Sequence, residues 1–172
     1  TRATLGSRVN PSGLIEDVAL LGSEEVINGD FATDSDWDKG TGWTIGGGTA
    51  NCNNTSGSTQ DLKTENRILN LGGKTVKIEF TVSNYSGSAS MIVTLQGTGG
   101  NDFTGINANG TYTAYSTIAS GENSIDLLFQ ASNGWIGSID NVSVKEATID
   151  GLARVDYTDG TGSLLVEPQR TN

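Results

Sequence analysis

Strict alternation of apolar and polar residues is the feature that most constrains what this chain of 172 residues can fold into. In the stretch 75–83, apolar residues occupy every second position: Val76, Ile78, Phe80 and Val82. Only a half-buried β-strand turns every second side chain to the same face. The stretches 91–95 and 125–129 repeat the pattern. The chain is therefore predicted to be built from strands.

Turn-forming residues separate these stretches. The chain contains 24 glycines but two prolines, and glycine and asparagine tolerate the positive φ angles that tight turns need. Strands recur at roughly 8–12 residue intervals, a spacing typical of a sandwich or barrel. Only residues 62–71 could contain a short turn of helix. We therefore predict an all-β fold.

The charge of the chain limits its partners. Twenty acidic and 10 basic residues give a net charge of −10, and the chain has no histidine. Such a surface repels phosphate backbones and anionic lipids, so we predict neither a nucleic-acid nor a membrane partner. No apolar run approaches the ~20 residues of a membrane span, and we expect a soluble chain.

Catalytic groups are not evident in the sequence. Cys52 is the one cysteine, and no histidine could activate it, so we interpret it as a small packed residue. Glycoside hydrolysis needs two carboxylates that converge across a cleft. Glu79 and Asp126 alternate with apolar residues and are predicted to point outward. We predict that the protein is not an enzyme.

Two short segments bracket the middle of the chain. The first is VINGDF at 26–31, followed by Trp37 and Trp43, and the second is GSIDNVSV at 137–144. Together they resemble the opening and closing strands of the CBM 4/9/22-type carbohydrate-binding modules, a galactose-binding-like superfamily. The resemblance covers residues 25–146. It implies a jelly-roll β-sandwich of two antiparallel sheets that binds glycans and often holds a structural calcium ion.

The two ends of the chain differ from its middle. Short strand-like segments there, such as RVN at 8–10 and LLVEPQRTN at 164–172, resemble the connecting segments of tailed-phage structural and tail-fibre proteins. We predict three parts: an N-terminal connector at 1–22, a carbohydrate-binding-like sandwich at 23–147 and a C-terminal connector at 148–172. The connectors are expected to pair with each other or with a neighbouring subunit. They predict a homo-oligomer, and the analogy to phage fibres suggests a trimer.

Asp140 is the strongest candidate for a metal ligand. It shares one face of the last predicted strand with Val142 and Val144, so it points inward if they do. A buried carboxylate needs a cation, hydrogen bonds or protonation to compensate it. The resemblance implies a calcium ion held by Asp30 and Asp140, although Ala32 stands where the family commonly has glutamate. The alternative is a carboxylate that caps backbone N–H groups of the first turn.

The acidic segment at 34–38 resembles the start of an EF-hand loop. Lys39 and Ile45 stand where that loop needs its glycine and its final glutamate. We interpret the segment as a solvated acidic loop, with weak adventitious calcium binding as the alternative.

Sugar recognition needs an exposed aromatic ring, because the apolar face of a pyranose stacks on a π surface. By parity Tyr115 shares a face with threonines and is the first candidate ligand residue. Tyr85 and Asn84 could rim a groove from their turn. The three tryptophans are expected to pack mainly in the core, and Trp135 is kept as a further ligand candidate. Supporting amides could come from any of Asn53, Asn54, Gln60, Gln96 and Gln130.

These observations lead to one functional prediction and one alternative. We predict a non-catalytic carbohydrate-binding module on the virion surface of a phage, in a tail fibre or on the capsid. It would adhere to host or environmental polysaccharide. The alternative is a structural virion decoration or spacer that mediates subunit contacts without binding sugar.

Overall fold

A computed structural model describes residues 6–9, 15–18, 20–100, 102–148, 154–156 and 163–165, with side chains for 21–100 and 102–148. The chain divides into two compact units. One comprises Gly22–Glu146, and the other combines Thr1–Leu21 with Ala147–Asn172. Each unit is described by itself below.

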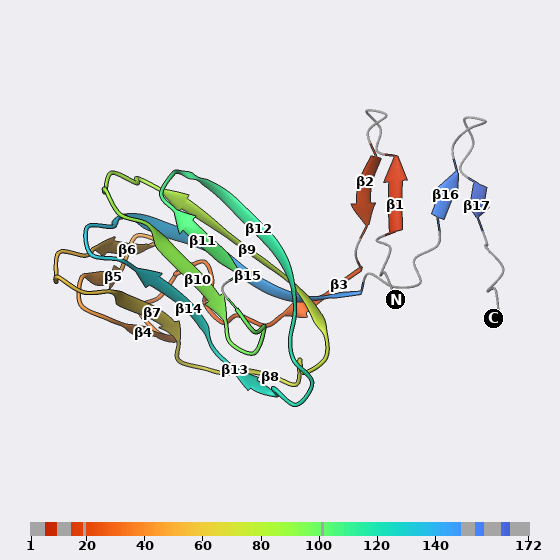
Figure 1. The fold of residues 1–172 in the computed structure, drawn as a ribbon, viewed down its shortest axis with the longest axis horizontal. Helices are drawn as coiled ribbons and strands as arrows, with labels where there is room; N and C mark the ends of the chain where they lie inside the picture. Colours follow the sequence, from red (N-terminus) through yellow and green to blue (C-terminus); the bar gives the residue numbers. More distant parts are fainter. Residues whose placement is uncertain are drawn as a thin grey trace. The chain divides into compact units, whose positions relative to one another are not determined.

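The larger unit is a β-sandwich with one five-stranded sheet (Figure 1). Its strands lie in the order β11-β10-β14-β7-β4, and each pair of neighbours is antiparallel. In that order the strands are Phe103–Ile106, Met91–Leu95, Leu127–Ala131, Gln60–Thr64 and Trp37–Lys39.

The second sheet has the order β12-β9-β15-β6-β5, and β3 also pairs with β15. In that order the strands are Gly110–Thr117, Thr75–Ser83, Ile136–Thr148, Ala50–Asn53 and Trp43–Ile45, and β3 is Leu20–Glu24. A small ladder joins β8 (Ile68–Leu69) to β13 (Ser124–Ile125). The described residues contain strands and no helix, which confirms the all-β prediction. Residues 62–71 contribute to β7 and β8 rather than to a helical turn.

The core lies between the two sheets. Along β9 every second side chain is buried, as the alternation in the sequence predicts. Phe80 lies at the centre of an aromatic cluster, with ring centroids 5.2 Å from Phe129, 5.0 Å from Phe103 and 5.3 Å from Tyr112. Burial of one such side chain contributes about 1.5–3 kcal/mol. The apolar side chains of the alternating strands therefore hold the sandwich together and leave its outer faces to polar residues.

The described residues of the smaller unit form two antiparallel strand pairs. β1 (Gly6–Val9) pairs with β2 (Ile15–Val18), and β16 (Arg154–Asp156) pairs with β17 (Ser163–Leu165). Each connector thus pairs within itself over its described residues. Pairing of the connectors with a neighbouring subunit stays a prediction, and much of the segment 164–172 lies outside the described residues.

Candidate functional site

Tyr115 lies on the outer face of the six-stranded sheet. Its side chain is 46% exposed, and no other aromatic residue is exposed in the part of the chain whose side chains are described. Along β12 the exposed positions alternate with half-buried ones, so the predicted sharing of one face by Tyr115 and its threonine neighbours is confirmed. Tyr115 lies opposite Lys77 of β9.

Two charged residues of β9, Lys77 and Glu79, lie opposite Tyr115 and Thr113 of β12. The Lys77 ammonium lies 2.7 Å from the Glu79 carboxylate, and the Thr113 hydroxyl donates a 2.9 Å hydrogen bond to the same carboxylate. The hydrogen bond from Lys77 is the main cause that lowers the pKa of Glu79 below its ordinary value of 4.5. Partial burial works against this shift, and the Thr113 hydrogen bond adds to it. Glu79 is therefore an ionised acceptor at neutral pH.

Hydroxyl groups extend this face along β12 and β9. The hydroxyls of Thr75 and Thr117 lie 3.0 Å apart, and those of Thr81 and Thr111 lie 3.2 Å apart. Both are cross-strand pairs in register. We name the set Thr111, Thr113, Tyr115, Lys77 and Glu79 the Tyr115 face.

Trp135 is a correction to the predicted ligand residues. Its side chain has no exposed surface, and its indole N–H donates a 3.0 Å hydrogen bond to the Ile106 carbonyl. The ring stacks on Trp43 at a centroid distance of 6.0 Å. Gly137 packs so closely that a Cβ there would lie 2.9 Å from the ring. Trp135 therefore cannot offer a ring face to a ligand, and its assignment as a ligand residue is wrong.

Tyr85 and Asn84 lie away from Tyr115. Tyr85 is half-buried, and its hydroxyl donates a 2.7 Å hydrogen bond to the Ala89 carbonyl. Asn84 is exposed, and its φ is 54°. Ser83 lies six positions along β9 from Lys77, which at about 3.3 Å per position is about 20 Å. The predicted ligand residues therefore do not form one site.

Asp140 is a second correction. A bulge interrupts the pairing of β15 with β9 between Asp140 and Ser143, and Asn141 adopts a positive φ of 53°. The extra residue reverses the parity of the strand. Ile139 and Val142 are both buried, whereas Asp140 is only half-buried. The predicted inward orientation of Asp140 alongside Val142 is wrong, because the parity argument assumed an uninterrupted strand.

The two predicted calcium ligands have other partners. Asp140 Oδ1 accepts a 2.6 Å hydrogen bond from the Asn141 backbone N–H. The exposed Asp30 accepts a long bond of 3.4 Å from the Ala32 N–H. Among the described residues no group of three or more histidine, cysteine or acidic side chains gathers as a metal site would require. The side-chain oxygens of Asp30 and Asp140 alone therefore do not make up a calcium site. Calcium binding by these two residues stays a proposal.

The acidic segment at 34–38 is paired with nearby polar groups. Asp34 forms an ion pair with Lys39, and Asp38 lies 3.3 Å from the Lys63 ammonium. Asp36 accepts a 2.9 Å hydrogen bond from the side-chain amide of Asn66. The segment is therefore paired with polar groups from other parts of the chain, and it enters β4 at the buried Trp37, so it is a loop only in part.

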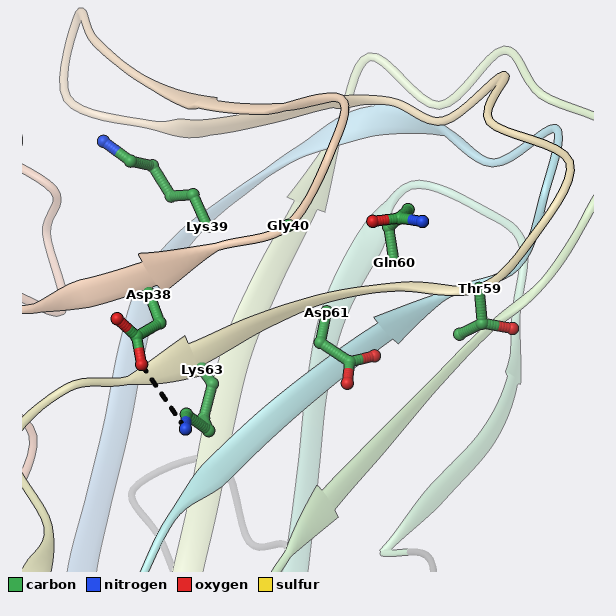
Figure 2. Close-up of a pocket in the computed structure, with 7 residues that line it drawn as sticks. All are labelled: Asp38, Lys39, Gly40, Thr59, Gln60, Asp61 and Lys63. Atoms are coloured by element: carbon green, nitrogen blue, oxygen red, sulfur yellow. Dashed lines mark ion pairs between the residues drawn. The ribbon is translucent and has the colours of Figure 1, made fainter.

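A groove of about 490 Å³ lies beside β4 and β7 of the other sheet (Figure 2). It is lined by Asp38, Lys39, Gly40, Thr59, Gln60, Asp61 and Lys63. The Gln60 amide is already engaged, since its oxygen accepts from the Thr41 N–H at 2.9 Å and its nitrogen donates to the Ser58 hydroxyl at 2.9 Å. No aromatic residue is among the lining residues.

The sequence reasoning did not find this groove. The alternation in QDLKT at 60–64 could have placed Asp61 and Lys63 on the outer face, because Leu62 and Thr64 are the buried positions. Their neighbour across the sheet, Asp38, comes from a strand of only three residues, which is too short to show a pattern.

Asp126 is a third correction. It is predicted to point outward, but its side chain is buried and lies 3.7 Å from the Arg67 guanidinium. Asp126 falls between β13 and β14, where the strand is interrupted, so the period-two rule does not hold at this residue.

Cys52 is buried, and its thiol contacts the Trp135 carbonyl at 3.8 Å. Burial raises the pKa of Cys52 to about 12. The thiolate, which is the nucleophilic form, is therefore strongly disfavoured at neutral pH. This agrees with the interpretation of Cys52 as a packed residue.

Comparison with solved structures shows the fold. A structure titled "CBM4 structure and function" matches with a TM-score of 0.53 and 17% identity, over 70% of this chain and 99% of that one. The CBM35 of Paenibacillus barcinonensis matches with a TM-score of 0.41 and 20% identity, over 71% and 95% of the two chains. No family profile and no curated protein matches the chain. The sandwich is thus a jelly roll similar to that of the CBM4 structure.

The described residues contain no helix long and apolar enough to cross a membrane.

Proposed function

We propose that this chain is a non-catalytic carbohydrate-binding module that contacts its ligand through the Tyr115 face. The observation that carries the proposal is the exposed ring of Tyr115 beside an ionised carboxylate and an ammonium group. The jelly-roll fold, which it shares with the CBM4 structure, supports the proposal.

The chemistry of the Tyr115 face suits a sugar. The C–H face of a pyranose stacks on an aromatic ring, and its hydroxyls need donors and acceptors beside that ring. Glu79 supplies an acceptor. Lys77 lies directly opposite Tyr115 and supplies a donor. Both groups are already held by their mutual ion pair, so a ligand would not have to order them.

A passive role agrees with the distribution of acidic groups. Glu79 is held ionised by Lys77, and Asp126 is buried against Arg67. Glu79, whose pKa is lowered, does not fit the acid of a glycosidase, which has a raised pKa and protonates the glycosidic oxygen while a second carboxylate lies across the scissile bond. The proposal therefore assigns no catalytic residue.

The biological setting belongs to the same proposal. We place the module on a phage virion, in a tail fibre or on the capsid surface, where it adheres to host or environmental polysaccharide. A single aromatic contact gives weak binding, but many linked copies raise the effective affinity by orders of magnitude. A homo-oligomer would supply those copies.

A glycan array probed with the full chain coupled to a multivalent carrier tests the proposal. We expect binding to at least one polysaccharide class by the wild type, retention of binding by Tyr115→Phe, which keeps the ring, and loss by Tyr115→Ala. Leu69→Ala is the matched control, because Leu69 is also an exposed apolar residue at 53% exposure. Absence of binding to every glycan would contradict the proposal and favour a structural decoration of the virion.

A further inference from the structure

Over the described residues the two sheets have five edge strands, β3, β4, β5, β11 and β12, which differ in length and charge. β3 has five residues and ends at the charged Glu24. β4 and β5 have three residues each, and β4 carries Asp38 and Lys39. β11 has four residues, includes Gly105 at φ of 71° and pairs irregularly with β10. Short length, charge and irregular pairing are the devices by which proteins protect a sheet edge from other strands.

β12 has none of these protections. It is an eight-residue strand, GTYTAYST, without a charged residue or a proline. It pairs in continuous register with β9 over its whole length, from Gly110 opposite Val82 to Thr117 opposite Thr75. No other strand of the described residues pairs with its second side (Figure 1). One side of β12 therefore presents an open row of backbone donors and acceptors.

We propose that β12 is a self-association edge, which pairs antiparallel with β12 of a second copy of this chain. The choice of a second copy follows from charge. The chain as a whole carries −10, so most surfaces repel a second copy, whereas the neutral segment 110–117 does not repel itself.

The side chains of β12 also suit this partner. Threonine pairs across strands are favourable contacts, and β12 already makes two of them with β9, at Thr117–Thr75 and Thr111–Thr81. Thr113 lies near the middle of the strand. If the two strands pair about Thr113, Thr113 faces its own counterpart, and Thr111 of one copy faces Tyr115 of the other.

The geometry of such a pair has a further consequence. Two identical antiparallel strands in one sheet are related by a two-fold axis perpendicular to it, and this contact closes at two copies. The outer faces of both copies then lie on the same side. The Tyr115 rings of two copies would share one surface. The self-association itself does not depend on sugar binding.

Analytical ultracentrifugation of the full chain tests the proposal over a concentration series up to roughly 1 mM, where even an association of about −4 kcal/mol is visible. We expect a reversible monomer–dimer equilibrium. Thr113→Lys should weaken it at least tenfold, because like charges then oppose each other across the new pair. The matched control is Thr44→Lys, which places the same charge at an exposed position of the short edge β5 and should leave the equilibrium unchanged.

A cross-linking scan gives an independent result. Thr111→Cys, Thr113→Cys and Thr117→Cys are oxidised separately, and the buried native Cys52 with its raised pKa does not compete. We expect disulfide-linked dimers from the position nearest the two-fold axis and few from Thr44→Cys. A chain that stays monomeric throughout, or an oligomer that responds equally to Thr44→Lys and Thr113→Lys, would overturn the assignment.

Discussion

The outer faces of the two sheets differ in the features that a sugar site needs. The six-stranded sheet presents an exposed ring at Tyr115 but no described hollow beside it, whereas the five-stranded sheet has a groove with charged lining and no ring. The polar side chains are paired on both faces, Asp38 with Lys63 in the groove and Glu79 with Lys77 beside Tyr115, so polar pairing does not distinguish the two faces. The comparison teaches that a hollow alone does not identify a sugar site, because stacking needs an accessible π surface.

The largest expected effect separates the two faces directly. Tyr115→Ala should weaken glycan binding about five- to thirtyfold, since stacking of one ring contributes on the order of 1–2 kcal/mol. Asp61→Ala, the matched truncation in the groove, should leave binding within twofold. Affinity measured by biolayer interferometry with a multivalent probe checks both variants. Equal losses of affinity in Tyr115→Ala and Asp61→Ala would contradict the assignment of glycan binding to the Tyr115 face.

Glu79 is expected to have the next largest effect. Glu79→Gln keeps the shape of the side chain but removes the charged acceptor, and should weaken binding about three- to tenfold, as expected for the loss of one charge-assisted hydrogen bond. Thermal unfolding should confirm that the variant is folded. A variant with unchanged affinity would remove Glu79 from the site.

The pH dependence follows from the same residue. The folded-state pKa of Glu79 lies below 4.5. The carboxylate therefore stays mostly ionised as the pH falls from 7 toward 4.5, and we expect the midpoint of any loss of glycan binding to lie below pH 4.5. The contribution of Glu79 to folding stability follows the same sign: it is present above pH 4.5 and is lost as the pH falls through the lowered pKa. A midpoint for binding near pH 6 would exclude Glu79 as its cause.

The groove ion pair is expected to have a small effect. Lys63→Met removes the partner of Asp38, and because both side chains are solvent-accessible, the stability change should be below about 1 kcal/mol. Chemical denaturation measures it, and glycan binding should stay unchanged. A larger loss of binding than in Tyr115→Ala would move the proposed site to the groove.

Calcium gives the smallest expected effect. If Asp30 and Asp140 hold an ion, adding calcium to chelator-treated protein should raise the melting temperature by a few degrees, and Asp140→Asn should abolish the rise. The shift is small because the side-chain donors are few. An unchanged melting temperature in excess chelator would remove calcium from the account.

Alternation allowed the sequence to predict the fold but not every side-chain direction. The strands at 75–83 and 91–95 and the outward face of Tyr115 follow from period two, because burial imposes that period wherever pairing is continuous. The same rule fails at Asp140, where a bulge adds a residue, and at Asp126, where the strand is interrupted. A bulge depends on the partner strand, which the local pattern does not contain.

The candidate site was predictable only in part. Tyr115 could be identified from its own strand, whereas Lys77 and Glu79 become its neighbours through the register of β12 with β9. The burial of Trp135 depends on contacts with Trp43 and Ile106, which come from distant parts of the chain. Tertiary packing therefore decides which aromatic residues remain available to a ligand.

Backbone amide NMR of the full chain, titrated with an oligosaccharide of the class selected on the glycan array, tests the central claim most directly. The account predicts that the largest chemical-shift changes occur at Thr113 and Tyr115 of β12 and at Lys77 and Glu79 of β9. Changes confined to residues 59–63 of the groove would contradict it.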